Sequence, residues 1–237
     1  MKQKRLLIAA VVLLVSAVFV FADTAISIGP AFTNYLVRTK MEGGTLPADV
    51  QAIVGDSFGN LKDEKNNAAG FALDVRGRFL YGMIQMAFPA KTHSDIINSN
   101  INDLKNSAII FDSQLGAGFT FFKKSPFNLF IGGGVGLNTM YAQKTMKLPV
   151  TGNEVSYAKL DFMLGAGANV LAQFYFTKHL GIYAGIADTV YFAPLVAKKE
   201  FKLPDGSTYN YGQSSDTQVK NTLANSLNVK AGLTIKF

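Results

Sequence analysis

Three adjacent residues, His93, Ser94 and Asp95, are the types that a hydrolase uses as base, nucleophile and orienting group. Neighbours in sequence do not supply that geometry without partners from other elements, and the chain has only one further histidine, His179. No cluster of His, Asp and Glu has the spacing of metal ligands, and the chain contains no Cys. The sequence therefore predicts a protein that is not an enzyme and that holds no metal or cofactor.

Glycine runs at residues 116–118, 132–136 and 165–167 resemble part of a dinucleotide-binding motif. That motif requires a strand followed by a helix, whereas these glycines lie inside segments of alternating polarity. Glycine lets a barrel strand bend and leaves space on its inner side. We therefore expect a structural role, and we add the hypothesis of a small internal void where the three runs face one another.

Charged side chains at alternate positions of several segments are further candidates for chemistry. They are Asp74, Asp112, Lys159, Asp161, Lys230 and Lys236. Their parity predicts a polar network inside a barrel, with Asp74 and Lys236 near one end and the other four residues in the opposite half. Because a barrel of eight strands is filled by side chains, we expect structural pairing of these charges. A gate or a proton path is the alternative.

The alternation that must position these residues is clearest at the C-terminus. From Leu227 to Phe237 every second residue is apolar or small, and the residues between them are polar or Gly. This period of two is typical of a strand with one apolar face. Eight such segments occur, at residues 24–38, 68–76, 79–89, 108–122, 127–142, 156–176, 180–193 and 222–237. In the seventh, Asp188 shares the parity of Ile182 and Ile186, so it faces outward unless a bulge changes the register.

The connections between these segments alternate between long and short. The long ones, residues 39–67, 90–107, 143–155 and 194–221, are polar, whereas residues 76–78, 123–126 and 177–179 form tight turns. This order predicts an all-β fold: an eight-stranded antiparallel up-and-down transmembrane β-barrel with four long outer loops and three short periplasmic turns. A soluble lipocalin-like barrel would have its apolar residues inside. The Asp, Asn, Gln and Lys content of the inward set favours a polar lumen.

The N-terminus has a basic start and an apolar run that ends in small residues. Residues 1–22 are therefore predicted to be a cleaved signal peptide, followed by the barrel at 23–237. An uncleaved anchor is the alternative. The formal net charge is +7, but the cations are dispersed along an exported chain, so we expect no binding of nucleic acid.

Aromatic residues gather in two groups, as in the two girdles of a membrane barrel. Beside the short turns are Tyr81, Phe121, Phe122, Phe127, Phe174, Tyr175, Phe176 and Phe237. Near the long loops are Tyr35, Phe71, Tyr141, Tyr157, Tyr191 and Phe192.

The long loops carry the residues that suit contacts with other molecules. Residues 47–54 have the pattern of a short amphipathic helix with Val50 and Ile53 on one face. Phe201, Tyr209 and Tyr211 surround a Pro-Asp-Gly turn that is typical of a hairpin. Exposed Tyr suits protein contacts. Lysines predicted at the outer rim suit anionic headgroups, and they are Lys144, Lys147, Lys198, Lys199 and Lys202.

The leader, the eight alternating segments, the loop pattern and the terminal Phe237 resemble the small eight-stranded outer-membrane barrels of the OmpA transmembrane-domain, OmpX and OmpW type. The resemblance covers the mature chain, and no motif indicates one subfamily. It implies a location in the cell outer membrane and an assembly signal at Phe237 that the barrel assembly machinery reads. It also implies contact with outer-membrane lipids and lipopolysaccharide-like headgroups.

From this resemblance we expect a monomer that acts at the cell surface through its loops. Adhesion to a host or extracellular protein, other environmental contacts and envelope integrity are the expected roles. A narrow channel for small hydrophobic molecules is the alternative, and a Pro that interrupts an outward strand, such as Pro30, would favour it. A lipid-modifying barrel enzyme is a third alternative, since enzymes of that kind use His and Ser at the surface.

Overall fold

The computed structural model describes residues 24–42, 61–89, 103–147, 153–211 and 218–237. The predicted signal peptide, the predicted helix at 47–54 with Val50 and Ile53, and the triplet His93 to Asp95 lie outside these residues. The described elements are all β-strands. In this part of the chain, no helix has the length and apolar character needed to cross a membrane.

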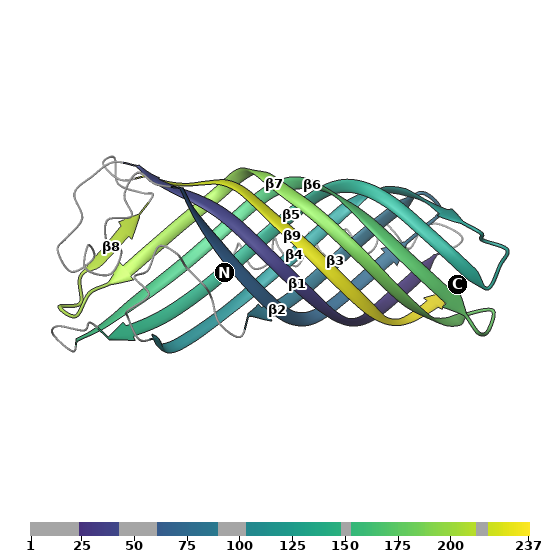
Figure 1. Ribbon diagram of the computed structural model, residues 1–237, viewed down its shortest axis with the longest axis horizontal. Helices are drawn as coiled ribbons and strands as arrows, with labels where there is room; N and C mark the ends of the chain where they lie inside the picture. The colour runs from purple at the N-terminus through teal and green to yellow at the C-terminus, as the bar shows by residue number, and fades with distance from the viewer. Residues whose placement is uncertain (1–23, 43–60, 90–102, 148–152, 212–217) are drawn as a thin grey trace.

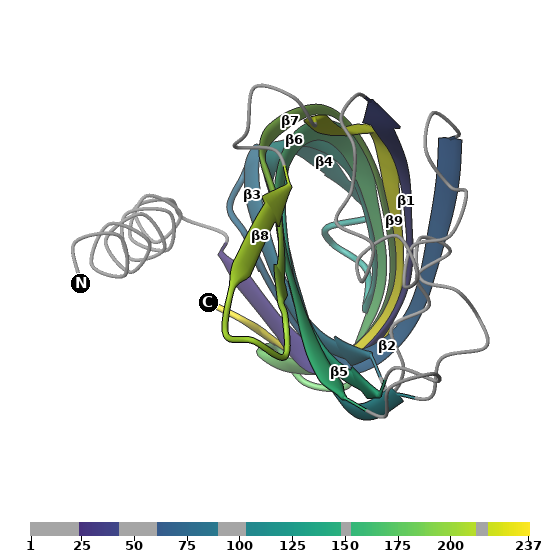
Figure 2. The same ribbon diagram turned by 90° about the vertical axis from the view of Figure 1, so that its left-hand side faces the viewer.

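Eight of the nine strands form a closed antiparallel barrel. The strands are β1 (Ala25–Glu42), β2 (Leu61–Arg76), β3 (Leu80–Pro89), β4 (Asp103–Phe121), β5 (Phe127–Lys147), β6 (Glu154–Tyr175), β7 (Leu180–Lys202), β8 (Thr208–Tyr211) and β9 (Gln218–Lys236). The order is β6-β5-β4-β3-β2-β1-β9-β7, and β6 also pairs with β7, so the sheet closes on itself (Figure 2). β8 pairs with the end of β7 outside this ring. The predicted eight-stranded barrel fold is confirmed.

The strands continue well past the ends that the sequence predicts. Residues 61–67, 103–107, 143–147 and 194–202 were expected in loops, but they are strand residues. Their alternation is hard to recognise because their outward positions are mostly polar, as expected for a face that meets water. The barrel is therefore taller than the apolar segments alone indicate (Figure 1).

Apolar side chains cover the outside of the barrel. On β9 the outward residues Leu227, Val229, Leu233 and Ile235 are all at least 39 % exposed, whereas Asn228 and Lys230 between them are buried. Polar residues inside and apolar residues outside are the reverse of a lipocalin-like barrel. The apolar part of β9, Leu227 to Ile235, is close to the roughly 9–11 residues that a tilted strand needs to cross the hydrocarbon core.

Outward polar pairs interrupt the apolar belt on β1, β7 and β9. Asn34 Nδ2 donates to Asn67 Oδ1 at 2.7 Å, and Asn225 Nδ2 donates to Asp188 Oδ1 at 2.7 Å. Asn34 and Asp188 flank Leu227 in the two neighbouring ladders. Asp188 keeps its outward parity, because the irregularities of the β6–β7 ladder come after it, around residues 191–196. Beyond Asn225, Leu223 is again apolar and exposed, and β9 continues from there to Gln218.

The two predicted aromatic girdles are unequal. Beside the tight turns the phenylalanines are exposed, and they include Phe79, Phe119, Phe121, Phe122, Phe127, Phe174, Phe176 and Phe237. Toward the other edge Phe71, Tyr141 and Phe192 are exposed. Five tyrosines assigned to the girdles are buried inside instead, because they occupy the inward parity of their strands: Tyr35, Tyr81, Tyr157, Tyr175 and Tyr191.

The space beside the inward glycines is filled by larger side chains. A Cβ atom added to Gly132 would lie 2.7 Å from Cζ of Phe130 and 2.8 Å from Cε1 of Tyr81. A Cβ atom on Gly136 would lie 2.4 Å from Cγ2 of Thr189. The hypothesis of an internal void at the glycine runs is therefore wrong, because rings and side chains from β3, β5 and β7 occupy the space.

This packing predicts a strong difference between two adjacent glycines. Gly132→Val is expected to lower the free energy of unfolding by about 1–3 kcal/mol, because the added methyl groups overlap the Phe130 and Tyr81 rings. Gly133→Val is the control, since a Cβ atom there faces outward and meets only the Gly167 carbonyl oxygen, at 3.5 Å. Urea unfolding of the refolded barrel, followed by far-UV circular dichroism, measures both. Equal losses in the two variants would contradict the packing.

Candidate functional site

An ion pair between β9 and β2 crosses the lumen. Lys230 Nζ lies 2.5 Å from Asp74 Oδ1, and Asn169 Nδ2 of β6 donates to the same oxygen at 2.9 Å. All three side chains are buried. The contact therefore neutralises two charges inside the barrel and ties together three strands that are distant in sequence.

Asp112 of β4 is held by uncharged donors. Tyr191 OH donates to Oδ1, and Asn228 Nδ2 donates to Oδ2 at 2.8 Å. On the same strand, Gln114 accepts a hydrogen bond from Tyr81 OH at 3.0 Å and donates to a threonine of β7. These bonds replace the water that the buried carboxylate and amide would otherwise bind.

Four charged residues form a second group toward the projecting ends of the strands, which we call the outer cluster: Glu64, Lys159, Asp161 and Lys199. Lys159 Nζ contacts Glu64 Oε2 and lies 2.7 Å from Asp161 Oδ2. Lys199 Nζ lies 3.6 Å from Glu64 Oε1. Each of the four is at most 2 % exposed, so two carboxylates and two ammonium groups share one buried site with no net charge.

A third network lies near the tight turns. Gln173 Nε2 donates to Thr234 Oγ1 at 2.8 Å and to Ser27 Oγ at 3.1 Å, while its Oε1 accepts a hydrogen bond from Arg76 Nη2. The Arg76 guanidinium also lies over the Phe130 ring, 5.1 Å from its centroid. Arg76 is thus fixed at the inner mouth of the barrel by one amide and one ring.

Aromatic and aliphatic side chains close the space between these polar layers. Tyr81 and Phe130 meet edge to face with ring centroids 5.3 Å apart, and Leu171 and Tyr183 pack beside them. A larger apolar cluster around Tyr35 fills the lumen farther along. Eight strands enclose an interior just wide enough for side chains, and here side chains occupy it.

The structure places the six predicted lumen residues in different surroundings. Asp74, Asp112, Lys159, Asp161 and Lys230 are buried inside the barrel, whereas Lys236 is half-buried at the inner mouth. Lys159 meets Asp161, and Lys230 meets Asp74. The predicted separation of Asp74 from Lys230 is wrong, because the strands are staggered and tilted and the lysine side chain reaches across the lumen.

Glu64, Lys199 and Arg76 are lumen residues that the sequence analysis missed. Glu64 and Arg76 share the parity of Asp74 along β2, but the predicted segment began only at Ala68, and Arg76 was also assigned to the tight turn at 76–78. Lys199 was missed because the two register shifts of the β6–β7 ladder interrupt the alternation in the sequence. Extending the second segment through its polar N-terminal end would have found Glu64, and following the inward parity from Asp74 would have found Arg76.

The predicted hairpin near the end of β7 is present. Phe201 pairs with Tyr209, and Lys199 pairs with Tyr211. At its turn, Asp205 accepts hydrogen bonds from Ser207 Oγ at 2.6 Å and from Ser207 N at 2.8 Å, which lower the pKa of the Asp205 carboxyl.

Three residues that the sequence analysis assigned to the outer surface are buried instead. Phe201, predicted as a surface contact, is buried against Tyr157 with ring centroids 4.8 Å apart. Lys144 and Lys199, predicted to contact headgroups, are also buried. All three occupy inward positions in strands that are longer than predicted. Lys147 and Lys202 are exposed.

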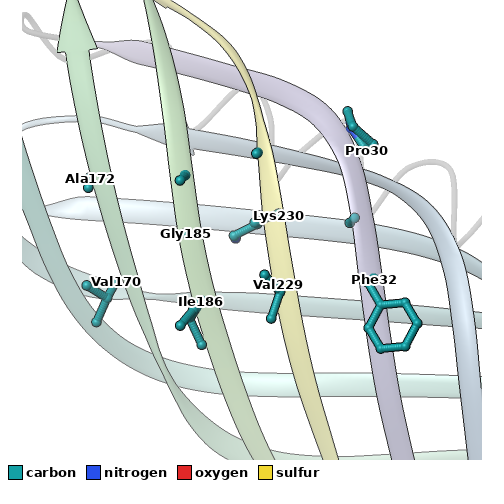
Figure 3. Close-up of a pocket in the computed structure, with 11 residues that line it drawn as sticks. Pro30, Phe32, Val170, Ala172, Gly185, Ile186, Val229 and Lys230 are labelled. Atoms are coloured by element: carbon teal, nitrogen blue, oxygen red, sulfur yellow. The ribbon is translucent and has the colours of Figure 1, made fainter.

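An apolar groove of about 640 Å³ crosses the outer face of β6, β7, β9 and β1 (Figure 3). Small residues form its floor, among them Ala172, Ala184, Gly185 and Ala231, and Phe32, Val170, Ile186 and Val229 also line it. The groove includes Pro30, where the β1–β9 ladder skips from Ile28–Leu233 to Ala31–Lys230. Proline has no N–H to donate at this seam.

The part of the chain that the structure describes contains no group of three or more His, Asp or Glu residues that could hold a metal ion. His179 lies at a tight turn, where its Nδ1 is 2.9 Å from the Lys236 carbonyl oxygen. The geometry of the described residues is thus that of a packed polar lumen with an apolar groove outside it.

A family model matches residues 20–237, and its description is a domain of unknown function, DUF2715. The chain belongs to the DUF2715 family. No significant match was found among curated protein sequences.

Solved structures similar to this DUF2715 chain are outer-membrane and surface proteins. OprG from Pseudomonas aeruginosa has 11 % identity and a TM-score of 0.51, over 92 % of this chain and 96 % of that one. Neisserial surface protein A has 14 % identity and a TM-score of 0.41, over 90 % and 99 %. Ail of Yersinia pestis has 16 % identity and a TM-score of 0.39, over 92 % and 100 %. Identities this low show the fold alone, which is that of the small outer-membrane barrels.

Proposed function

We propose that this chain is a non-enzymatic barrel that spans a cell outer membrane and acts at the surface through its projecting strands and loops. The observation that carries this proposal is the extension of paired strands past the apolar belt. β7 has 23 residues, about twice what a tilted strand needs to cross a bilayer. The extra length and the β7–β8 hairpin favour a stalk, formed by the outer ends of the strands, that presents the loops to an extracellular protein.

The packed lumen argues against an open aqueous pore. An ion or solute on the barrel axis would have to displace the Lys230–Asp74 pair and the Tyr81–Phe130 contact. The first is a buried pair of opposite charges, and the second is an edge-to-face contact of two buried rings. The charges in the lumen thus support a structural role, in agreement with the ordinary filling of eight-stranded barrels.

The groove beside Pro30 favours a second candidate function, a channel that takes small hydrophobic molecules sideways through the wall. The groove is apolar, it faces the hydrocarbon layer, and the interrupted β1–β9 seam lies in it. Lys230 lines the groove and also holds Asp74 in the lumen. A molecule entering this way would meet that ion pair first.

Trypsin digestion of whole cells, with electrophoresis of boiled and unboiled samples, tests the proposal. A folded barrel is expected to migrate differently before and after boiling. On intact cells trypsin is expected to cut near Lys202, beside the hairpin turn, and to spare Arg78, Lys123, Lys124 and Lys178 in the tight turns. Permeabilised cells are the control, since the tight turns then become accessible. Cuts at the tight turns of intact cells would reverse the orientation and overturn the proposed surface role.

Vesicles that contain the purified barrel separate the two candidate functions. The surface role predicts no conductance and no faster entry of a small aromatic dye. Faster dye entry that Ala231→Phe abolishes would favour the hydrophobic channel, because this substitution fills the groove. Leu233→Phe, also outward on β9 but outside the groove lining, is the matched control.

A further inference from the structure

The seam between β7 and β9 is paired only in its inner part. The ladder between these two strands ends at the pair Tyr191–Ala224. Beyond it, β7 stays paired with β6 as far as Lys202, and β9 stays paired with β1 as far as Gln218. Toward their outer ends β7 and β9 diverge (Figure 1 and Figure 2). Among the described residues, the segment 218–223 of β9 therefore has a ladder on one edge only.

The short strand β8 lies at this seam but does not close it. β8 pairs antiparallel with the end of β7, from Lys202–Thr208 to Lys199–Tyr211. Because β7 is also antiparallel to β9, β8 and β9 run in the same direction. No ladder joins these two strands in the part of the chain that the structure describes. One extended segment running the opposite way would be antiparallel to both, as neighbouring strands are in the rest of the sheet.

The backbone at the seam suits such a segment. An unpaired strand edge presents a row of N–H and C=O groups that another strand can complete. β9 offers this edge over residues 218–223. β7 is the poorer template, because Pro194 has no N–H and the β6–β7 ladder shifts register around it. The hydrogen bonds of an added strand would therefore come chiefly from β9 and β8.

Apolar side chains beside the seam are exposed. Phe192 and Leu195 of β7 are 58 % and 53 % exposed, and Leu223 of β9 is 42 % exposed. Leu223 pairs with Arg38 of β1, and Arg38 Nε lies 2.8 Å from Asp63 Oδ1 of β2 in a surface ion pair. An ion pair on the outer face requires contact with water or headgroups. Exposed apolar side chains next to it indicate a contact surface for another molecule.

We propose that the seam between β8 and β9 binds an extended segment of an extracellular protein, which joins the sheet as one more strand. This inference deepens the proposed surface function and rests on it, because the seam must lie outside the cell. The added strand would pair with residues 218–223 of β9 and with β8. Its apolar side chains would cover Phe192, Leu195 and Leu223. A proline-free stretch that alternates between apolar and polar residues has this chemistry.

Selection from a random display library of peptides, on the purified barrel in lipid nanodiscs, tests this site. Nanodiscs without the barrel remove background binders, and the enriched peptides are expected to alternate between apolar and polar residues. The best peptide is then made with alternate backbone nitrogens methylated, which blocks one edge but keeps every side chain. Its affinity is expected to fall at least about tenfold, since each lost backbone hydrogen bond contributes about fivefold. Equal affinity of the two peptides, or no enrichment, would overturn the added strand.

Hydrogen–deuterium exchange and one matched pair of variants locate the bound peptide. Slower exchange is expected at residues 218–223 and in β8, with no change in β3. Leu223→Lys is expected to weaken binding by about fivefold, the contribution of one apolar cross-strand contact. Tyr141→Lys is the control, because Tyr141 is equally exposed, at 42 %, but lies in a strand with ladders on both edges. Equal losses from the two substitutions would contradict the site.

Two further measurements separate this inference from its alternatives. A barrel dimer in analytical ultracentrifugation that Leu223→Lys dissociates would assign the seam to a second copy of the chain and overturn the peptide site. The boiling-dependent gel shift and the trypsin digestion of whole cells report on the folding and orientation of the same proteins. A correctly oriented, folded barrel that binds no peptide at the seam would overturn only this inference and leave the proposed function intact.

Discussion

Lys230→Met is expected to lower the free energy of unfolding by about 3–5 kcal/mol, because removal of one partner of a buried ion pair leaves the other charge without compensation. Lys230 Nζ and Asp74 Oδ1 are 2.5 Å apart, and both residues are fully enclosed. Asn169 remains as the donor to Asp74, but an amide replaces only part of the interaction with an ammonium group. The chain has no Trp, so urea unfolding is best followed by far-UV circular dichroism.

Two further variants show whether this loss comes from the unpaired charge. Asp74→Leu combined with Lys230→Met is expected to recover much of the stability, because replacing a buried pair by apolar residues is often neutral. Lys65→Met, at an exposed position of β2, is the control and should change stability by less than about 0.5 kcal/mol. If Lys230→Met instead leaves stability unchanged and opens a measurable conductance, the pair is a gate and its structural role is wrong.

Lys159→Met is expected to lower the free energy of unfolding by at least as much, about 3–5 kcal/mol, because this ammonium group contacts two buried carboxylates. It contacts Glu64 Oε2 and lies 2.7 Å from Asp161 Oδ2. Loss of the positive charge would leave Glu64 and Asp161 in one enclosed site beside Lys199. The same unfolding measurement applies, and limited proteolysis is expected to show the damage in the outer halves of β2, β6 and β7.

Lys199→Met is the matched comparison within the outer cluster. Its Nζ is 3.6 Å from Glu64 Oε1, a weaker contact than those of Lys159. Lys159 would still contact both carboxylates, so the expected loss is smaller than that of Lys159→Met. A larger loss from Lys199→Met would show that the positive charges are shared differently from the arrangement described above.

The variants at Lys230 and Asp74 and those at Lys159 and Lys199 probe two different positions along the barrel axis. Lys230 and Asp74 join β9 to β2 across the membrane-spanning part, whereas the outer cluster joins β2, β6 and β7 in the part that projects. Loss of the first pair should weaken the whole barrel. Loss of the second should weaken the stalk before the belt, because the strands below keep their own ladder and packing.

The sequence by itself determined the barrel, because the apolar belt requires a strict period of two. Segments such as Leu227–Phe237 and 156–176 alternate without interruption where one face meets hydrocarbon. The tight turns can also be predicted from the sequence, since two consecutive alternating segments are separated only by Lys123-Lys124-Ser125-Pro126 or by Thr177-Lys178-His179. The inward parity also identified Asp74, Asp112, Lys159, Asp161 and Lys230 as lumen residues from their positions alone.

Only the tertiary structure decided how long the strands are and which lumen charges meet. Beyond the belt both faces of a strand contact polar groups, so the pattern that indicates a strand disappears although the ladder continues, as at Glu64 and Lys199. The pairing of Asp74 with Lys230 depends on strand tilt, on stagger around a closed ring and on the reach of a lysine side chain. The alternation of polar and apolar residues in one segment shows which face is inside. It does not show which residues of strands far apart in sequence lie at the same level along the barrel axis.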